Sequence, residues 1–159
     1  MTSKVPSTRH STLSTQYFTC ETPQDTFDLG EYLGNKLSGG DTVLLYGDLG
    51  AGKTLFTKGV LYALDFDVDE VNSPSFTLVN LYRTENFDVY HIDFWRLDEN
   101  SDVAAAVGLS EILEDETAVV ICEWSERLKN FSFPKNVFRV KIEGDGDDPR
   151  RITIQNSGD

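Results

Sequence analysis

The chain has 159 residues, and 39% of them are hydrophobic, which is enough for one domain with an apolar core of its own. Its 14 basic and 27 acidic residues give a net charge of −13, so independent binding to a nucleic-acid backbone is disfavoured. No stretch approaches the roughly 20 apolar residues that a membrane span needs, and we expect no membrane partner. The two cysteines fit neither a zinc site nor a disulfide framework, so we expect a reducing, cytoplasmic compartment.

Residues 1–15 are predicted to be a flexible N-terminal extension, followed by a single domain over residues 16–159. The first 20 residues contain no acid, carry Lys4, Arg9 and His10, and are rich in Ser and Thr. This composition is also compatible with an organellar transit peptide. The lack of an apolar face favours a disordered polar extension instead.

A short strand is predicted over residues 16–20, and a well-marked helix start follows it. The Thr22 hydroxyl can cap free backbone amides, Pro23 suits the first helical position, and Asp25 suits the positive end of the helix dipole. We expect this helix to end at the glycine pair 39–40.

Residues 41–46 are predicted to be a buried strand, and residues 53–64 a helix with one apolar face. A loop signal at 72–75 comes next. Two extended runs, 76–83 and 87–97, then have the spacing of an antiparallel hairpin.

The rest of the chain continues the alternation of helices and strands. The predicted elements are a helical stretch at 101–113 interrupted near Gly108, a buried strand at 118–122, a helical turn at 125–129, and strands at 137–142 and 151–155 around a turn-rich connector at 144–149. Together these elements predict an α/β fold of the P-loop NTPase type, with a mixed β-sheet, flanking helices and antiparallel hairpins.

The segment 47–54, Gly-Asp-Leu-Gly-Ala-Gly-Lys-Thr, matches the phosphate-binding pattern G-x-x-x-x-G-K-[ST]. The context supports the match, because a buried strand leads in and an apolar-faced helix leads out. Its glycines bring backbone amides against phosphate oxygens, Lys53 is expected to reach the β- and γ-phosphates, and Thr54 to bind Mg²⁺. The residues expected to contact the nucleotide are Asp48, Leu49, Gly50, Ala51, Gly52, Lys53, Thr54 and Leu55.

A P-loop enzyme also needs a carboxylate near the metal. Glu123 follows the buried strand 118–122, and it is a candidate for holding Mg²⁺ or orienting the attacking water. Asp93 is the second candidate, since strand alternation places it on the same face as His91, and a buried acid needs a partner or a metal. With Lys53, these two acids are the candidate catalytic residues. His91 by itself is interpreted as a satisfied core or rim histidine.

Four further residues are candidates for a nucleotide switch or sensor. Ser73, Ser75 and Thr77 follow the P-loop helix, where hydroxyls can meet the γ-phosphate or Mg²⁺ and be released after hydrolysis. An ordinary Ser-Pro turn explains this segment equally well. Trp124 stands beside Glu123 and is either a cover for the site or a core residue.

The nucleotide is predicted to be ATP. A GTPase of the usual kind carries Asn-Lys-x-Asp downstream of its P-loop, whereas the only Asn-Lys pair here is Asn35-Lys36, which lies upstream. A small-molecule kinase would show an arginine-rich lid, yet only Arg83 lies between Thr54 and Asp93. This scarcity of arginine suggests that a partner supplies catalytic charge in trans.

Several motifs occur together in the order of one known family. They are the P-loop, Asn-Ser-Pro-Ser-Phe-Thr at 72–77 with Tyr82, Tyr-His-Ile-Asp-Phe-Trp-Arg-Leu at 90–97, Gly108-Leu109, and Glu123-Trp124. Over about residues 22–127 the chain closely resembles the TsaE (YjeE) family of bacterial tRNA threonylcarbamoyladenosine biosynthesis ATPases. Departures are mild: Ser75 stands where the family usually has Thr, and Phe94-Trp95 replaces the commoner Leu-Tyr. The connector at 144–149 is peripheral to the resemblance.

The resemblance implies a partner-dependent ATPase. Family members bind the TsaD–TsaB complex, which modifies adenosine at position 37 in tRNAs reading ANN codons, and they meet tRNA only through that complex. By matching position, Lys53 and Thr54 would bind phosphate and Mg²⁺, while Asp93 and Glu123 would act around metal and water. Two alternatives stay open: a small-molecule or nucleoside kinase that needs no partner, and a non-catalytic nucleotide sensor.

Overall fold

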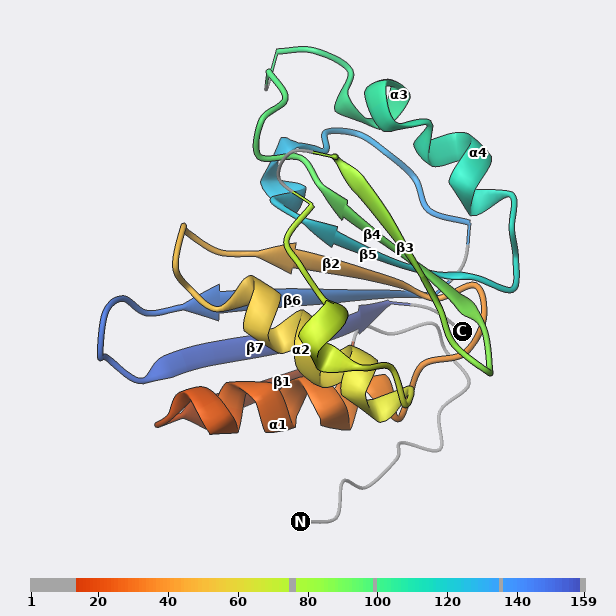
Figure 1. The fold of residues 1–159 in the computed structure, drawn as a ribbon. Helices are drawn as coiled ribbons and strands as arrows, with labels where there is room; N and C mark the ends of the chain where they lie inside the picture. The colour runs from red at the N-terminus through yellow and green to blue at the C-terminus, as the bar shows by residue number, and fades with distance from the viewer. Residues whose placement is uncertain (1–13, 75–76, 99, 135, 158–159) are drawn as a thin grey trace.

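The computed structural model describes residues 14–74, 77–98, 100–134 and 136–157. These residues form a seven-stranded sheet in the order β1-β7-β6-β2-β5-β4-β3, with helices on both faces (Figure 1). The strands are β1 (Ser14–Cys20), β2 (Thr42–Tyr46), β3 (Val79–Arg83), β4 (Asp88–Asp93), β5 (Val119–Glu123), β6 (Val137–Glu143) and β7 (Arg150–Ser157). The helices are α1 (Pro23–Gly34), α2 (Lys53–Ala63), α3 (Val103–Val107) and α4 (Leu109–Leu113), with short 3₁₀ turns η1 (Val68–Glu70) and η2 (Ser125–Arg127).

The middle of the sheet is parallel and its edges are antiparallel. Strands β6, β2, β5 and β4 run parallel, whereas β7 and β1 at one edge and β3 at the other pair antiparallel with their inner neighbours. The predicted mixed α/β sheet is confirmed, and so is the predicted β3–β4 hairpin. This order places the carboxyl ends of β2, β5 and β4 at one rim, which is where ligands of open α/β sheets bind.

Side chains of the central strands alternate between two apolar layers. On one face, α1 and α2 pack over strand residues that include Val43 and Ile121. On the other face, α3 and α4 cover Leu44, Val120 and Cys122. The prediction that the strand now labelled β5 is buried on both faces is confirmed. Burial raises the pKa of the Cys122 thiol on this strand.

Helices α1 and α2 approach each other to backbone contact (Figure 1). A Cβ atom added at Gly30 would lie 2.2 Å from the carbonyl oxygen of Phe56, and one added at Gly59 would lie 2.0 Å from that of Phe27. Only glycine fits so close an approach. The contact fixes the position of α2, and therefore of Lys53 at its first turn.

The start of α1 is as predicted, but its end is not. Thr22 and Asp25 form a complete capping box. The helix ends at Gly34, well before the glycine pair 39–40 that was expected to terminate it. The first glycine of that pair serves a close approach instead, because a Cβ atom there would lie 2.6 Å from the carbonyl oxygen of Thr117.

The start of β1 and the end of β4 also differ from prediction. Strand β1 starts at Ser14 rather than residue 16, because its first residues continue to pair with β7. Strand β4 ends at Asp93 rather than continuing to residue 97, because the amide of Leu97 donates to the carbonyl oxygen of Phe94 and closes a turn. The predicted interruption at Gly108 is confirmed, since this residue has a φ of 69° between α3 and α4.

Some sequence predictions fall on other parts of the chain. Residues 1–13 and Ser75 lie outside the described residues, so the flexible extension over residues 1–13 and this sensor position stay predictions. The predicted extension is wrong for Ser14 and Thr15, which belong to β1. Among the described residues, no helix has the length and apolar character needed to cross a bilayer.

Candidate functional site

The turn between β2 and α2 is built around glycines. Gly47, Gly50 and Gly52 have φ angles of 154°, 80° and 113°, which residues with side chains rarely adopt. The first hydrogen bond of the helix runs from the Phe56 amide to the Gly52 carbonyl, so the amides of residues 53–55 have no partner within the helix. The helix start therefore directs backbone donors and the positive end of its dipole toward an anion.

Lys53 lies over this turn. Its Nζ donates to the carbonyl oxygens of Gly47 and Asp48, at 2.5 and 3.1 Å, and lies 4.1 Å from the centre of the Trp124 ring. Only 5% of the residue is exposed. This burial lowers the pKa of the Lys53 amine, while nearby carboxylates, with Glu123 the strongest, act in the opposite direction. The cation lies beside the helix donors, where both would face the same phosphate group.

Thr54 faces the carboxylate at the end of β5. Its Oγ1 is 3.3 Å from both carboxylate oxygens of Glu123, although 69 positions separate the two residues. Asp93 is the register partner of Glu123 in the parallel pairing of β4 with β5, so the two acids lie side by side. Only 3% of Glu123 and 2% of Asp93 is exposed. Carboxylates this deeply buried require hydrogen-bond donors or cations.

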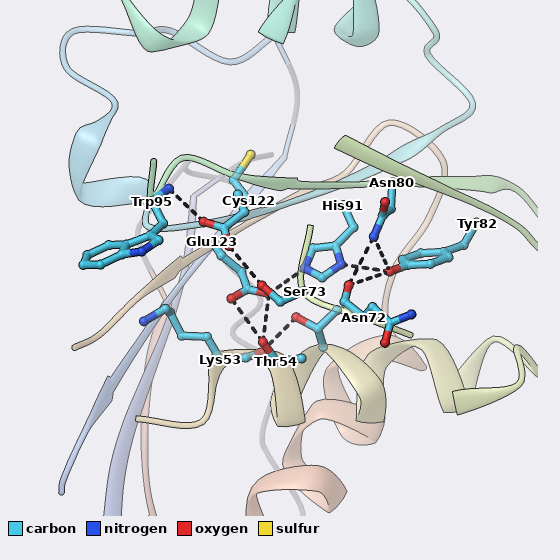
Figure 2. A network of polar contacts seen from close by, with 12 residues as sticks. Lys53, Thr54, Asn72, Ser73, Asn80, Tyr82, His91, Trp95, Cys122 and Glu123 are labelled. Atoms are coloured by element: carbon cyan, nitrogen blue, oxygen red, sulfur yellow. Dashed lines mark hydrogen bonds and ion pairs between the residues drawn. The ribbon is translucent and has the colours of Figure 1, made fainter. Parts of the chain in front are cut away.

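Neighbouring elements supply these donors. Asp93 accepts from the Ser73 hydroxyl at 3.0 Å and from the Trp95 amide at 2.8 Å. Glu123 Oε2 lies 2.6 Å from Nε2 of His91, which is fully buried (Figure 2). The interpretation of His91 as a satisfied buried residue is therefore confirmed, and its partner is one of the candidate catalytic acids.

A cavity of about 400 Å³ opens between the P-loop and these strand ends. Its lining consists of Leu49, Gly50, Gly52, Lys53, Thr54, Leu55, Ser73, Asp93, Trp95, Glu123 and Trp124. The fold thus brings all three candidate catalytic residues to one hollow. Two of the expected nucleotide contacts, Asp48 and Ala51, do not line this cavity, and each lines another hollow next to the P-loop.

The structure separates the candidate sensor residues. Ser73 lines the cavity, whereas Thr77 donates its hydroxyl proton to the side-chain oxygen of Asn80, at 3.0 Å, away from the cavity lining. Trp124 lines the cavity and packs against Trp95, with the ring centres 4.5 Å apart and the planes tilted by 34°. The two tryptophans therefore form one wall of the hollow.

Comparison with known proteins decides the family. The family described as threonylcarbamoyl adenosine biosynthesis protein TsaE matches residues 20–152. The chain belongs to the TsaE family. The tRNA threonylcarbamoyladenosine biosynthesis protein TsaE of Bacillus subtilis is 33% identical over 132 residues, which cover 83% of this chain and 80% of that protein. The protein of the same name from Rickettsia felis is 35% identical over 120 residues, covering 76% of this chain and 68% of the relative.

A solved structure supports the same conclusion. The crystal structure of Bacillus subtilis YdiB matches with a TM-score of 0.69 and 28% sequence identity, covering 92% of this chain and 88% of that one. The resemblance to the TsaE family and the predicted P-loop type of fold are therefore confirmed.

Two supports of the P-loop in this TsaE-family chain were missed by sequence reasoning. Arg150, the first residue of β7, donates to the carbonyl oxygens of Ala51 and Gly50, at 2.9 and 3.3 Å. The carboxylate of Glu126 accepts from the amide of Gly47 at 2.8 Å. Neither residue was singled out by a motif, and both reach the turn only when the sheet is formed. The connector treated as peripheral in the sequence therefore leads into a residue that supports the turn between β2 and α2.

The polar groups at this TsaE-family site fit Mg²⁺. The Thr54 hydroxyl and the Glu123 carboxylate, with Asp93 alongside, are the hard oxygen ligands that this ion prefers. Within the described ranges, no three His, Cys, Asp or Glu side chains gather into a metal-binding group. A nucleotide-bound Mg²⁺ needs only one or two protein carboxylates, because phosphates and waters complete its coordination.

Proposed function

We propose that this chain is an Mg-ATP-dependent ATPase that acts with the TsaD–TsaB complex in tRNA threonylcarbamoyladenosine biosynthesis. The modification would be placed on adenosine at position 37 of tRNAs that read ANN codons. One observation carries the enzymatic part: Thr54 and Glu123 face each other at 3.3 Å beside the cavity that Lys53 also lines. The family to which the chain belongs supports the pathway.

The residues around the cavity would divide the work of binding and hydrolysis. Lys53 exchanges its backbone carbonyl partners for oxygens of the β- and γ-phosphates, which the amides of the P-loop also bind. Thr54 and Glu123 would hold Mg²⁺, which would supply positive charge to the phosphates when bound. Glu123 would orient the attacking water, and Asp93, its register partner, would act around the metal.

A second cavity, of about 380 Å³, adjoins the P-loop and suits the nucleoside. It shares Gly50, Gly52 and Leu55 with the first cavity, and Thr22 and Arg150 contribute to its walls. An ATP molecule whose phosphates lie on the P-loop would place its ribose and base there, in a concave site of mixed polarity.

A protein partner belongs to the proposal for two reasons. The described lining of the first cavity contains lysine but no arginine, and P-loop enzymes can receive a transition-state arginine in trans. The net charge of −13 also suits a protein partner better than direct contact with tRNA. We therefore expect tRNA to be met only through the TsaD–TsaB complex, in the cytoplasm.

ATP hydrolysis by the purified chain, with and without TsaD–TsaB, tests this function. We expect slow basal hydrolysis, a higher rate with the partners, and loss of both with Lys53→Ala. Equal activity with and without the partners would favour the kinase or the sensor. A pull-down in which the chain ignores TsaD–TsaB but binds bare tRNA at physiological salt would contradict the proposed partnership.

A further inference from the structure

A series of polar contacts through the buried residues His91 and Tyr82 links Glu123 to the loop that follows η1 (Figure 2). His91 Nε2 lies 2.6 Å from Glu123 Oε2, and His91 Nδ1 lies 3.2 Å from the hydroxyl oxygen of Tyr82. That hydroxyl donates to the carbonyl oxygen of Asn72 at 3.0 Å. Because His91 is fully buried and Tyr82 only 6% exposed, water competes little for the two contacts that His91 makes.

We propose that Tyr82 and His91 are positioning residues that couple the Glu123 carboxylate to the backbone of Asn72. We name this pair the Tyr82–His91 relay. The inference rests on the proposed ATPase function, in which Glu123 orients the attacking water. Neither relay residue lines the cavity, so both act through Glu123 rather than on the nucleotide.

The direction of each hydrogen bond makes this coupling specific. A carboxylate only accepts, so His91 donates to Glu123 from Nε2. In a neutral imidazole this leaves Nδ1 as an acceptor, and it faces the single proton of the Tyr82 hydroxyl. The carbonyl oxygen of Asn72 competes for the same proton. When the Tyr82 hydroxyl donates to Nδ1 of His91, it stabilises the Nε2–H tautomer, which is the one that donates to Glu123. The loop and the carboxylate are therefore linked through the Tyr82 proton.

Asn80 allows the tyrosine proton to move without leaving the Asn72 carbonyl oxygen without a protein donor. Its side-chain amide donates to the Asn72 carbonyl oxygen at 3.2 Å and to the Tyr82 hydroxyl at 3.3 Å. The carbonyl therefore keeps a donor when Tyr82 turns its proton toward His91. Packing holds the Tyr82 ring in place while its hydroxyl turns, since Phe66 lies against it with the ring centres 4.9 Å apart.

The same loop also reaches the second acid of the site. Ser73, which follows Asn72, donates directly to Asp93, while Asn72 reaches Glu123 through the relay. The two acids are register partners on neighbouring strands. A displacement of this loop therefore acts on both carboxylates, and a nucleotide contact to Ser73 in the cavity would be transmitted to Glu123.

The first test removes one hydroxyl from the relay. For Tyr82→Phe in the full chain with its partner complex, we expect kcat to fall about tenfold or more. The Kd for ATP should stay within about twofold, because the relay does not touch the nucleotide. The fluorescence of the two tryptophans measures this Kd, since both line the cavity. Tyr90→Phe is the matched control on the neighbouring strand β4, with its ring in the opposite apolar layer, and should change neither value.

The second test separates positioning from space filling. His91→Gln keeps an amide donor that can reach Glu123, whereas His91→Leu keeps a side chain of similar volume without a donor. Positioning predicts that the Gln variant retains clearly more kcat than the Leu variant at unchanged Kd. Equal kcat in the two variants would overturn the inference.

Imidazole nitrogen NMR measures the tautomer of the His91 ring directly, so this test does not depend on ATP hydrolysis. The chain contains two histidines, so His10→Gln leaves the His91 ring as the single imidazole signal. We expect the Nε2–H tautomer to predominate in this background, and a mixture of tautomers when Tyr82→Phe is added. An unchanged tautomer after loss of the hydroxyl would overturn the inference, even if kcat falls.

The failure of the relay and the failure of the proposed function give different results. If the unaltered chain with TsaD–TsaB does not hydrolyse ATP, the proposed function is wrong. In that case a tautomer change with Tyr82→Phe would still establish the link between the loop and His91, and its absence would refute that link.

Discussion

The two walls of the candidate site are built in different ways. The P-loop wall comes from one continuous turn over residues 47–54, whose shape depends on glycines in unusual conformations. The opposite wall carries Asp93 and Glu123 at the ends of two strands, and the parallel register of β4 with β5 places them side by side. One wall follows from local backbone preference, whereas the other follows from the pairing of strands.

This difference teaches how each wall should respond to change. On the P-loop wall most donors are backbone amides, so Lys53 is the side chain whose loss matters most there. On the strand wall the polar groups are side chains that satisfy one another in a buried network. Removing one of them leaves its partner unsatisfied. We therefore expect nucleotide binding to fail with the first wall, and hydrolysis to fail with the second.

The largest effect is expected from Lys53→Ala. Lys53 is the one lysine or arginine in the described lining of the cavity, so its loss removes the cation that would meet the phosphates. We expect the Kd for ATP to rise by about 100-fold or more, measured by titration calorimetry. Lys58→Ala, on the same helix but outside the cavity lining, should bind ATP normally. Unchanged binding by Lys53→Ala would remove the basis for a phosphate-binding wall.

Glu123→Gln should impair hydrolysis, which we assign to the strand wall, and leave nucleotide binding by the P-loop wall nearly unchanged. The amide keeps the size of the side chain but loses the negative charge that would hold Mg²⁺ and orient water. We expect kcat with the partner complex to fall about 100-fold, with the Kd for ATP changed by only a fewfold. Glu85→Gln, in the exposed β3–β4 turn, is the control. If Glu123→Gln weakened binding as much as hydrolysis, the assigned division between the walls would be wrong.

Asp93→Asn tests the second acid of the strand wall. Its amide can still accept from Ser73, so a smaller loss is expected, about tenfold in kcat. The Mg²⁺ concentration needed for half-maximal rate should rise as well, which a titration of hydrolysis against Mg²⁺ measures. Asp88 lies at the opposite end of β4, so Asp88→Asn is the control and should behave as the unaltered chain. A normal Mg²⁺ titration for Asp93→Asn would exclude a role near the metal.

The smallest effect is expected from Arg150→Ala, which asks whether the P-loop wall is wholly local. This substitution removes the hydrogen bonds to the carbonyl oxygens of Gly50 and Ala51. We expect the Kd for ATP to rise by about three- to tenfold, because each such bond contributes roughly 1 kcal/mol to holding the turn. Arg151, the next residue, is exposed, and Arg151→Ala is the control. Equal affinities in the two variants would show that the turn holds its shape without β7.

The sequence by itself determined the features whose causes are local. The glycine spacing of the P-loop, the helix cap at Thr22, the strand buried on both faces at 118–122 and the β3–β4 hairpin were all predicted. Backbone preference and hydrophobic periodicity act over a few residues, so a single segment is enough to reveal them. The motif order was also sufficient to identify the family.

Only the tertiary structure decided which distant groups meet. Nothing in the local sequence showed that His91 would bind Glu123, or that Arg150 and Glu126 would support the P-loop. Each of these contacts depends on strand order, register or the path of a loop. The burial of the whole sheet sets those features, and no segment's own preference contains them.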